Sequence, residues 1–249
     1  AYARAAAAGD AHGMAEHGRC LLHGIGGAAA PERGEALLLA AQGAGWQQAR
    51  GELERFWFGR AMALLRAAGD AGDPGLKLAV ACLRRAATSG HRRAAFMLGE
   101  CLRHGTGTAI DPAEALAWLR RAAALPDAKV IVGDLLYFGQ GVPRDPAEAF
   151  RWYQRAAIEH RDAYAMYSCG YCLLHGEGVE HDLRAALRWL RRAAQQGEVD
   201  ACHELGMAYL REGRTGRRLA RRWLRAAADH GHAGARRVLD EVAAGLHPA

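Results

Sequence analysis

The sequence lacks the features that would indicate a membrane protein or a hydrolase. Its 249 residues include no apolar run of the roughly 18 residues that a transmembrane helix needs, so no membrane span is predicted. Ser89 and Ser168 are the only serines, and neither stands in a nucleophile motif. No Ser–His or Cys–His signature is present either. The sequence therefore predicts a protein that is not an enzyme.

Lysine is also scarce, because Lys77 and Lys129 are the only two. The net charge of +6 therefore depends on arginine, which is concentrated near the end of the chain. We define the basic patch as the five arginines Arg214, Arg217, Arg218, Arg221 and Arg222. Clustered arginine attracts phosphate or carboxylate groups. Three interpretations stay open: a solvated capping surface, a site for an acidic protein, or a nucleic-acid site. The last has least support, since no aromatic residues for base stacking are interleaved.

No charged-then-apolar leader segment is present. The chain begins at Ala1 without methionine, and residues 1–6 resemble the tail of a repeat helix such as residues 189–196. We therefore expect a fragment of a longer chain. A cytoplasmic location is the first expectation, and a periplasmic one is the alternative if a signal peptide has been removed. Of six cysteines, Cys20, Cys101 and Cys172 share one repeat position. Reduced, buried thiols are the favoured interpretation, and disulfides are the alternative.

The most informative feature that is present is a repeated tryptophan. Trp118, Trp152, Trp189 and Trp223 are spaced 34, 37 and 34 residues apart. Each has alanine three residues before it and an alanine pair four and five residues after it. A fixed period of this size is the signature of stacked helical repeats. Each repeat is predicted to hold two helices, the first ending at a glycine such as Gly105 and the second beginning at an aspartate such as Asp111.

Residues 98–123, 133–157 and 170–194 resemble a Sel1-like repeat, a relative of the tetratricopeptide repeat. The resemblance implies an all-α, right-handed superhelical solenoid of about six helix–turn–helix repeats, in sequences of bacterial type. We expect a partial leading helix over 1–9, repeats over about 13–43, 46–90, 93–125, 127–160, 163–197 and 199–231, and a closing helix over 232–246. The second repeat is irregular, and residues 46–68 are predicted to form one unusually long helix.

Two patterns suggest cofactors or metals and are better explained by the fold. Gly-x-Gly pairs such as Gly105 and Gly107 would follow a helix, whereas a dinucleotide-binding loop follows a strand. His23, His104 and His175 share one repeat position, but they fall in the first, third and fifth repeats. Packed helices lie about 8–10 Å apart, so these imidazoles could not share one ion at about 2 Å. No cofactor and no metal site are predicted.

The resemblance implies a non-catalytic adaptor or scaffold that binds another protein in a groove lined by the first helices. The residues expected to line it are Trp57, Glu100, Arg103, His104, Asp134, Tyr137, Tyr171, His175, Met207 and Arg211. Trp57 lies between Phe56 and Phe58, and three consecutive aromatics on a helix cannot all face one core. Either Trp57 is exposed as an anchor residue, or the irregular repeat buries all three. Alternative functions are an immunity-type inhibitor that caps a bacterial effector enzyme, and nucleic-acid binding through the basic patch. The partner and the oligomeric state stay open.

Overall fold

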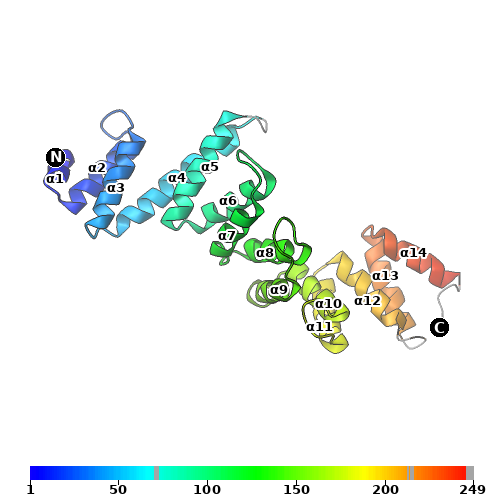
Figure 1. The fold of residues 1–249 in the computed structure, drawn as a ribbon. Coiled ribbons are helices and arrows are strands. Elements are labelled where there is room, and N and C mark those ends of the chain that lie inside the picture. Colours follow the sequence, from blue (N-terminus) through cyan, green and yellow to red (C-terminus); the bar gives the residue numbers. More distant parts are fainter. Residues whose placement is uncertain (70–72, 212, 214–215, 245–249) are drawn as a thin grey trace. The chain divides into compact units, whose positions relative to one another are not determined.

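The computed structural model describes residues 1–69, 73–211, 213 and 216–244. Within these residues the chain forms fourteen α-helices, and no strand is found (Figure 1). None of the described helices is long and apolar enough to cross a membrane. The predicted all-α class is confirmed, whereas the right-handed superhelical path stays a prediction.

The helices pack as consecutive pairs. Each first helix has its most extensive contacts with the helix that follows it. The first helices are α2 (Ala11–His23), α4 (Gln48–Ala67), α6 (Arg92–His104), α8 (Pro126–Phe138), α10 (Ala163–His175) and α12 (Val199–Arg211). The second helices are α3 (Pro31–Gly43), α5 (Pro74–Ser89), α7 (Pro112–Arg121), α9 (Pro146–His160), α11 (Leu183–Gln195) and α13 (Arg217–Asp229). Before and after these pairs lie α1 (Tyr2–Ala7) and α14 (Ala233–Ala243). The chain divides into two compact units, residues 1–125 and residues 126–249, and each is described by itself.

Local sequence explains where the helices begin and end. The side chains of Asp145 and Asp182 each accept a hydrogen bond from the third backbone amide beyond them, at 2.8 and 2.9 Å. This satisfies an amide that the helix itself cannot satisfy. At the other end, Gly176 closes α10 in the left-handed conformation, which glycine adopts at little cost. The long helix predicted over 46–68 is present as α4, with twenty residues.

Close packing within a helix pair depends on a glycine in the first helix. A Cβ atom on Gly133 would lie 2.5 Å from Cε1 of Tyr153 in α9. A Cβ on Gly170 would lie 2.6 Å from Cγ of Leu190 in α11. Both contacts are shorter than carbon atoms tolerate, so only glycine allows the large side chain of the second helix to pack on the first helix.

The second glycine of the Gly-x-Gly loop serves contact between repeats. Gly178 has a φ of +70°, and a Cβ there would lie 2.2 Å from the backbone carbon of Pro146, where α9 begins. Gly107 approaches the backbone of Leu76, near the start of α5, in the same way. In these two repeats the loop therefore packs directly on the backbone of the preceding repeat, which explains both glycines without a nucleotide.

The repeated tryptophans are packing residues with arginine partners. The indole Nε1 of Trp118 donates to Glu114, and that of Trp152 donates to Glu148, both at 3.0 Å. A guanidinium covers each ring. The four pairs are Arg121 over Trp118, Arg155 over Trp152, Arg192 over Trp189 and Arg222 over Trp223, with Cζ between 4.5 and 5.4 Å from the ring centroid. Part of the arginine content is therefore used within the repeats as cation–π contacts.

Candidate partner-binding site

A strip of aromatic rings runs along one face of α10. Tyr164, Tyr167, Tyr171 and His175 follow one another at intervals of three or four residues, the spacing that places side chains on one face of a helix. Neighbouring ring centroids lie 6.0, 6.0 and 4.3 Å apart. All four side chains are partly or fully exposed, so the strip forms surface and not core.

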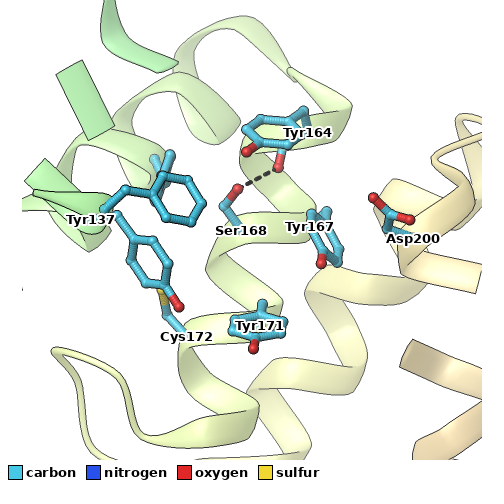
Figure 2. Close-up of a pocket in the computed structure, with 9 residues that line it drawn as sticks. Tyr137, Tyr164, Tyr167, Ser168, Tyr171, Cys172 and Asp200 are labelled. Carbon is cyan, nitrogen blue, oxygen red and sulfur yellow. Dashed lines mark hydrogen bonds between the residues drawn. The ribbon is translucent and has the colours of Figure 1, made fainter. Parts of the chain in front are cut away.

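Side chains from α8, α9 and α12 complete a pocket around this strip. We define the tyrosine pocket by its lining residues, which enclose about 350 Å³: Tyr137, Phe138, Tyr153, Tyr164, Tyr167, Ser168, Tyr171, Cys172 and Asp200. Tyr137 faces the α10 tyrosines across the pocket, and Asp200 lies beyond Tyr167 (Figure 2). Five of the seven tyrosines of the sequence thus gather at one place.

Asp134 of α8 holds two of these rings in position. Its Oδ1 accepts hydrogen bonds from the Tyr153 hydroxyl at 2.7 Å and from the Tyr164 hydroxyl at 3.2 Å. Tyr153 is only 2% exposed and forms part of the floor. Burial, followed by the Asp134 carboxylate, raises the pKa of Tyr164 to about 12. Both hydroxyls therefore stay protonated near neutral pH and link α8, α9 and α10 through one carboxylate.

The rim of the pocket carries further carboxylates. Burial raises the pKa of Tyr167, and the charges of Asp200 and Glu204 raise it further. Tyr171 is affected in the same way by burial and by the charges of Glu204 and Glu177. Carboxylates therefore lie near the Tyr167 and Tyr171 rings.

Basic groups lie close to some of these carboxylates. Arg144 forms an ion pair with Glu177 at 2.5 Å. The His175 and His203 side chains lie 3.8 and 3.5 Å from Glu204. Burial works to raise the pKa of Glu204, but the His203 hydrogen bond and nearby basic side chains lower it overall. Glu204 is therefore ionised at neutral pH.

The repeat itself can be compared with known families. A family model described as the Sel1 repeat matches six segments: residues 11–41, 60–91, 92–127, 126–159, 163–198 and 199–232. The chain belongs to the Sel1 repeat family. The second match begins inside α4, so only the end of this long helix follows the pattern. Sel1 repeats are generally non-catalytic binding scaffolds.

Solved structures show the same fold. A protective antigen present in uropathogenic Escherichia coli strains, described as displaying an SLR fold, aligns over 100% of this chain at 24% identity and a TM-score of 0.66. This chain spans 52% of that protein, about half its length. A Sel1 repeat protein from Oxalobacter formigenes is 32% identical over 80% of this chain and 81% of its own, with a TM-score of 0.58.

An immunity protein from Pseudomonas aeruginosa aligns over 73% of this chain and 67% of its own at 22% identity. Its TM-score of 0.41 is too low to support an argument about function. No curated protein sequence matches the chain.

Of the residues expected to line a groove, three belong to the tyrosine pocket or its support. Tyr137 and Tyr171 line it, and Asp134 bonds two of its hydroxyls. His175 ends the aromatic strip. Met207 and Arg211 lie on α12 of the same unit; Met207 is half-buried and Arg211 is exposed. In the first unit, Glu100 and Arg103 of α6 pair with each other at 3.0 Å beside the exposed His104.

The interpretation of Trp57 as an exposed anchor is wrong. Trp57 of α4 is buried to 3% exposure. The guanidinium of Arg85 lies 4.6 Å from its ring centroid, and the Phe56 ring packs against it at 4.8 Å. The long α4 helix therefore turns Trp57 toward α5, while Phe58 stacks on His91. The indole Nε1 is buried without a hydrogen-bond partner.

The basic patch lies on α13, apart from Arg214, which is outside the described residues. Arg218, Arg221 and Arg222 are exposed, and Arg217 is half-buried. Arg222 also stacks on Trp223. Among the described residues, no three His, Cys, Asp or Glu side chains are placed to hold one metal ion. The six cysteines are free thiols in the structure.

The sequence reasoning missed Tyr164, Tyr167, Phe138 and Asp200 as lining residues. A signal was present for two of them, because Tyr164 and Tyr167 extend the three-and-four spacing that leads to Tyr171. No comparable signal marks Phe138 or Asp200. These come from other helices and reach the pocket only through the packing of successive repeats.

Proposed function

We propose that this Sel1 repeat protein is a non-catalytic interaction scaffold and that the tyrosine pocket of its second unit is the partner-binding site. The observation that carries this proposal is the gathering of five tyrosines at one half-buried surface. Tyrosine is over-represented among the residues that contribute most to protein–protein affinity. Its ring gives contact area, and its hydroxyl can meet a polar group at the same time.

The packing of the pocket supports a pre-formed binding surface. Tyr153 and Tyr164 are fixed by Asp134, and Ser168 Oγ donates to the backbone oxygen of Tyr164 at 3.0 Å (Figure 2). Rings that are already held in place lose little conformational freedom when a partner binds, which favours affinity. Met207 and Arg211 of α12, which belong to the same unit, would extend this surface.

Quantitative affinity purification from the source cells tests the proposal. The wild type, Tyr171→Ala and Tyr2→Ala are compared, because Tyr2 is 46% exposed but lies outside the pocket. We expect a partner that the wild type and Tyr2→Ala retain and that Tyr171→Ala retains at least about tenfold less, as for a hot-spot residue. Equal recovery with all three proteins, each shown by circular dichroism to be folded, would contradict the proposal.

The identity of the retained partner and a DNA-binding measurement separate the alternative functions. If the retained partner is an enzyme whose activity falls on binding, the immunity-type inhibitor is favoured. Nucleic-acid binding through the basic patch predicts instead a salt-dependent retention on DNA. This retention should disappear when Arg217, Arg218, Arg221 and Arg222 are replaced by alanine, and it should be unaffected by Tyr171→Ala.

A further inference from the structure

We propose that the tyrosine pocket receives a cationic side chain of the partner, the guanidinium of an arginine or the ammonium of a lysine. This inference rests on the proposed function and adds the chemistry of the partner segment. The charges at the rim, the aromatic rings and an intramolecular contact of the same kind support it.

The charge of the rim favours a cationic occupant. The chain as a whole carries +6, yet the carboxylates of Asp134, Glu177, Asp200 and Glu204 lie in or beside this pocket. Arg144 neutralises Glu177, and further basic groups close to the rim are His175, His203, His232 and, near Glu204, Arg211. The Asp200 side chain is 52% exposed, although His232 lies 3.4 Å away. An anionic segment would meet these carboxylates, whereas a cationic one would be attracted to them.

The aromatic rings of the pocket also favour a cation. The face of an aromatic ring is electron-rich and attracts a cation that lies within about 6 Å of the ring centroid. Tyr164, Tyr167 and Tyr171 place three such rings in sequence, 6.0 Å apart, with Tyr137 opposite (Figure 2). A side chain that enters between them can contact a ring on one side and approach the Asp200 carboxylate at the far end of the pocket.

The protein already makes such a contact at the pocket. The guanidinium of Arg144 lies 5.5 Å from the centroid of the Tyr137 ring and also pairs with Glu177. An aromatic face and a carboxylate thus hold an arginine together at this rim. Tyr167 with Asp200 repeats this combination of groups on the other side of the pocket. A volume of about 350 Å³ lies near the lower end of the range for binding pockets, which suits one or two inserted side chains.

The test begins with an unbiased selection of dodecapeptides displayed on phage against the full chain. The selected peptide is then synthesised in two forms. One form keeps its arginines, and in the other each arginine is replaced by citrulline, the neutral isostere of arginine. Binding of both is measured by isothermal titration calorimetry. We expect the selection to enrich arginine or lysine over acidic residues, and the citrulline form to bind roughly tenfold more weakly.

Matched variants assign the effect to the pocket. Tyr167→Leu removes a ring from the strip, and Asp200→Asn removes a rim charge. Both should weaken the arginine peptide by about three- to thirtyfold and leave the citrulline peptide nearly unchanged. Tyr2→Leu and Asp240→Asn alter an exposed tyrosine and an exposed aspartate outside the pocket, and both should bind the arginine peptide like the wild type.

The outcomes separate this inference from the proposed function. If the selected peptides are acidic or neutral, or if the citrulline form binds as well as the arginine form, while Tyr171→Ala still abolishes binding, the inference is overturned and the pocket remains the binding site. If the arginine peptide binds Tyr171→Ala as tightly as the wild type, it binds elsewhere and both proposals fail. A selection that enriches no peptide also counts against both.

Discussion

Replacing Gly133 by alanine should destabilise the second unit, although alanine is the better helix former. The new methyl group would lie 2.5, 2.8 and 3.0 Å from three ring carbons of Tyr153. Tyr153 is 2% exposed and cannot move without disturbing its neighbours. Overpacking of this kind costs about 1–3 kcal/mol. Displacement of the ring would also weaken the 2.7 Å hydrogen bond to Asp134. This loss would lower the free energy of unfolding by about 1 kcal/mol more.

The intrinsic preference of alanine for helices acts in the opposite direction and stabilises by about 1 kcal/mol. The net expectation for Gly133→Ala is therefore a loss of about 1–3 kcal/mol in the free energy of unfolding. The control is Gly59→Ala in α4, since a Cβ there meets nothing within 4 Å. This variant should gain up to about 1 kcal/mol.

Urea unfolding followed by circular dichroism measures both changes. Because the chain forms two compact units, hydrogen exchange of peptides from α8 and α9 is needed to show where the loss occurs. Exchange there should accelerate in Gly133→Ala and stay unchanged in Gly59→Ala. The reasoning would be refuted if Gly133→Ala were as stable as the wild type, because the ring would then have room to move at no cost.

Three further predictions concern the second unit, residues 126–249, and the cysteines. Asp182→Ala should cost about 1 kcal/mol in urea unfolding, because it removes the N-cap of α11. The Lys129 ammonium hydrogen-bonds Glu159 and lowers the pKa of that carboxyl below 4.5. The pair's stabilisation is therefore complete above about pH 4.5 and lost as pH falls through the folded-state pKa. Lys129→Met should remove this part of the pH dependence of the urea midpoint, and an unchanged profile would contradict it. Burial raises the pKa of Cys172 to about 12, so a thiol reagent at about pH 8 should label the half-buried Cys20 first.

The sequence was sufficient for the repeat and for several of the helix ends. The aspartate caps and the glycine that ends α10 act through contacts within a few residues, so the local sequence is enough to predict them. The Gly-x-Gly pairs were expected to follow a helix, but the contact of Gly178 with Pro146 of the preceding repeat was not predicted. This contact depends on how one repeat packs on the next.

The site was predicted only in part for the same reason. Tyr137 and Tyr171 were chosen from the phase of regular repeats, and both line the pocket. Trp57 was misplaced because the irregular second repeat shifts the phase of α4, so that the ring packs beneath Arg85. Asp200 carried no local signal at all.

What the sequence by itself determined is the helical repeat: its period, its caps and the small residues that let two helices meet. These follow from interactions between residues that are close along the chain. Only the tertiary structure decided that five tyrosines and a rim of carboxylates share one pocket in a basic protein. The environment of each ring depends on side chains from other helices, and the packing between successive helices brings them together.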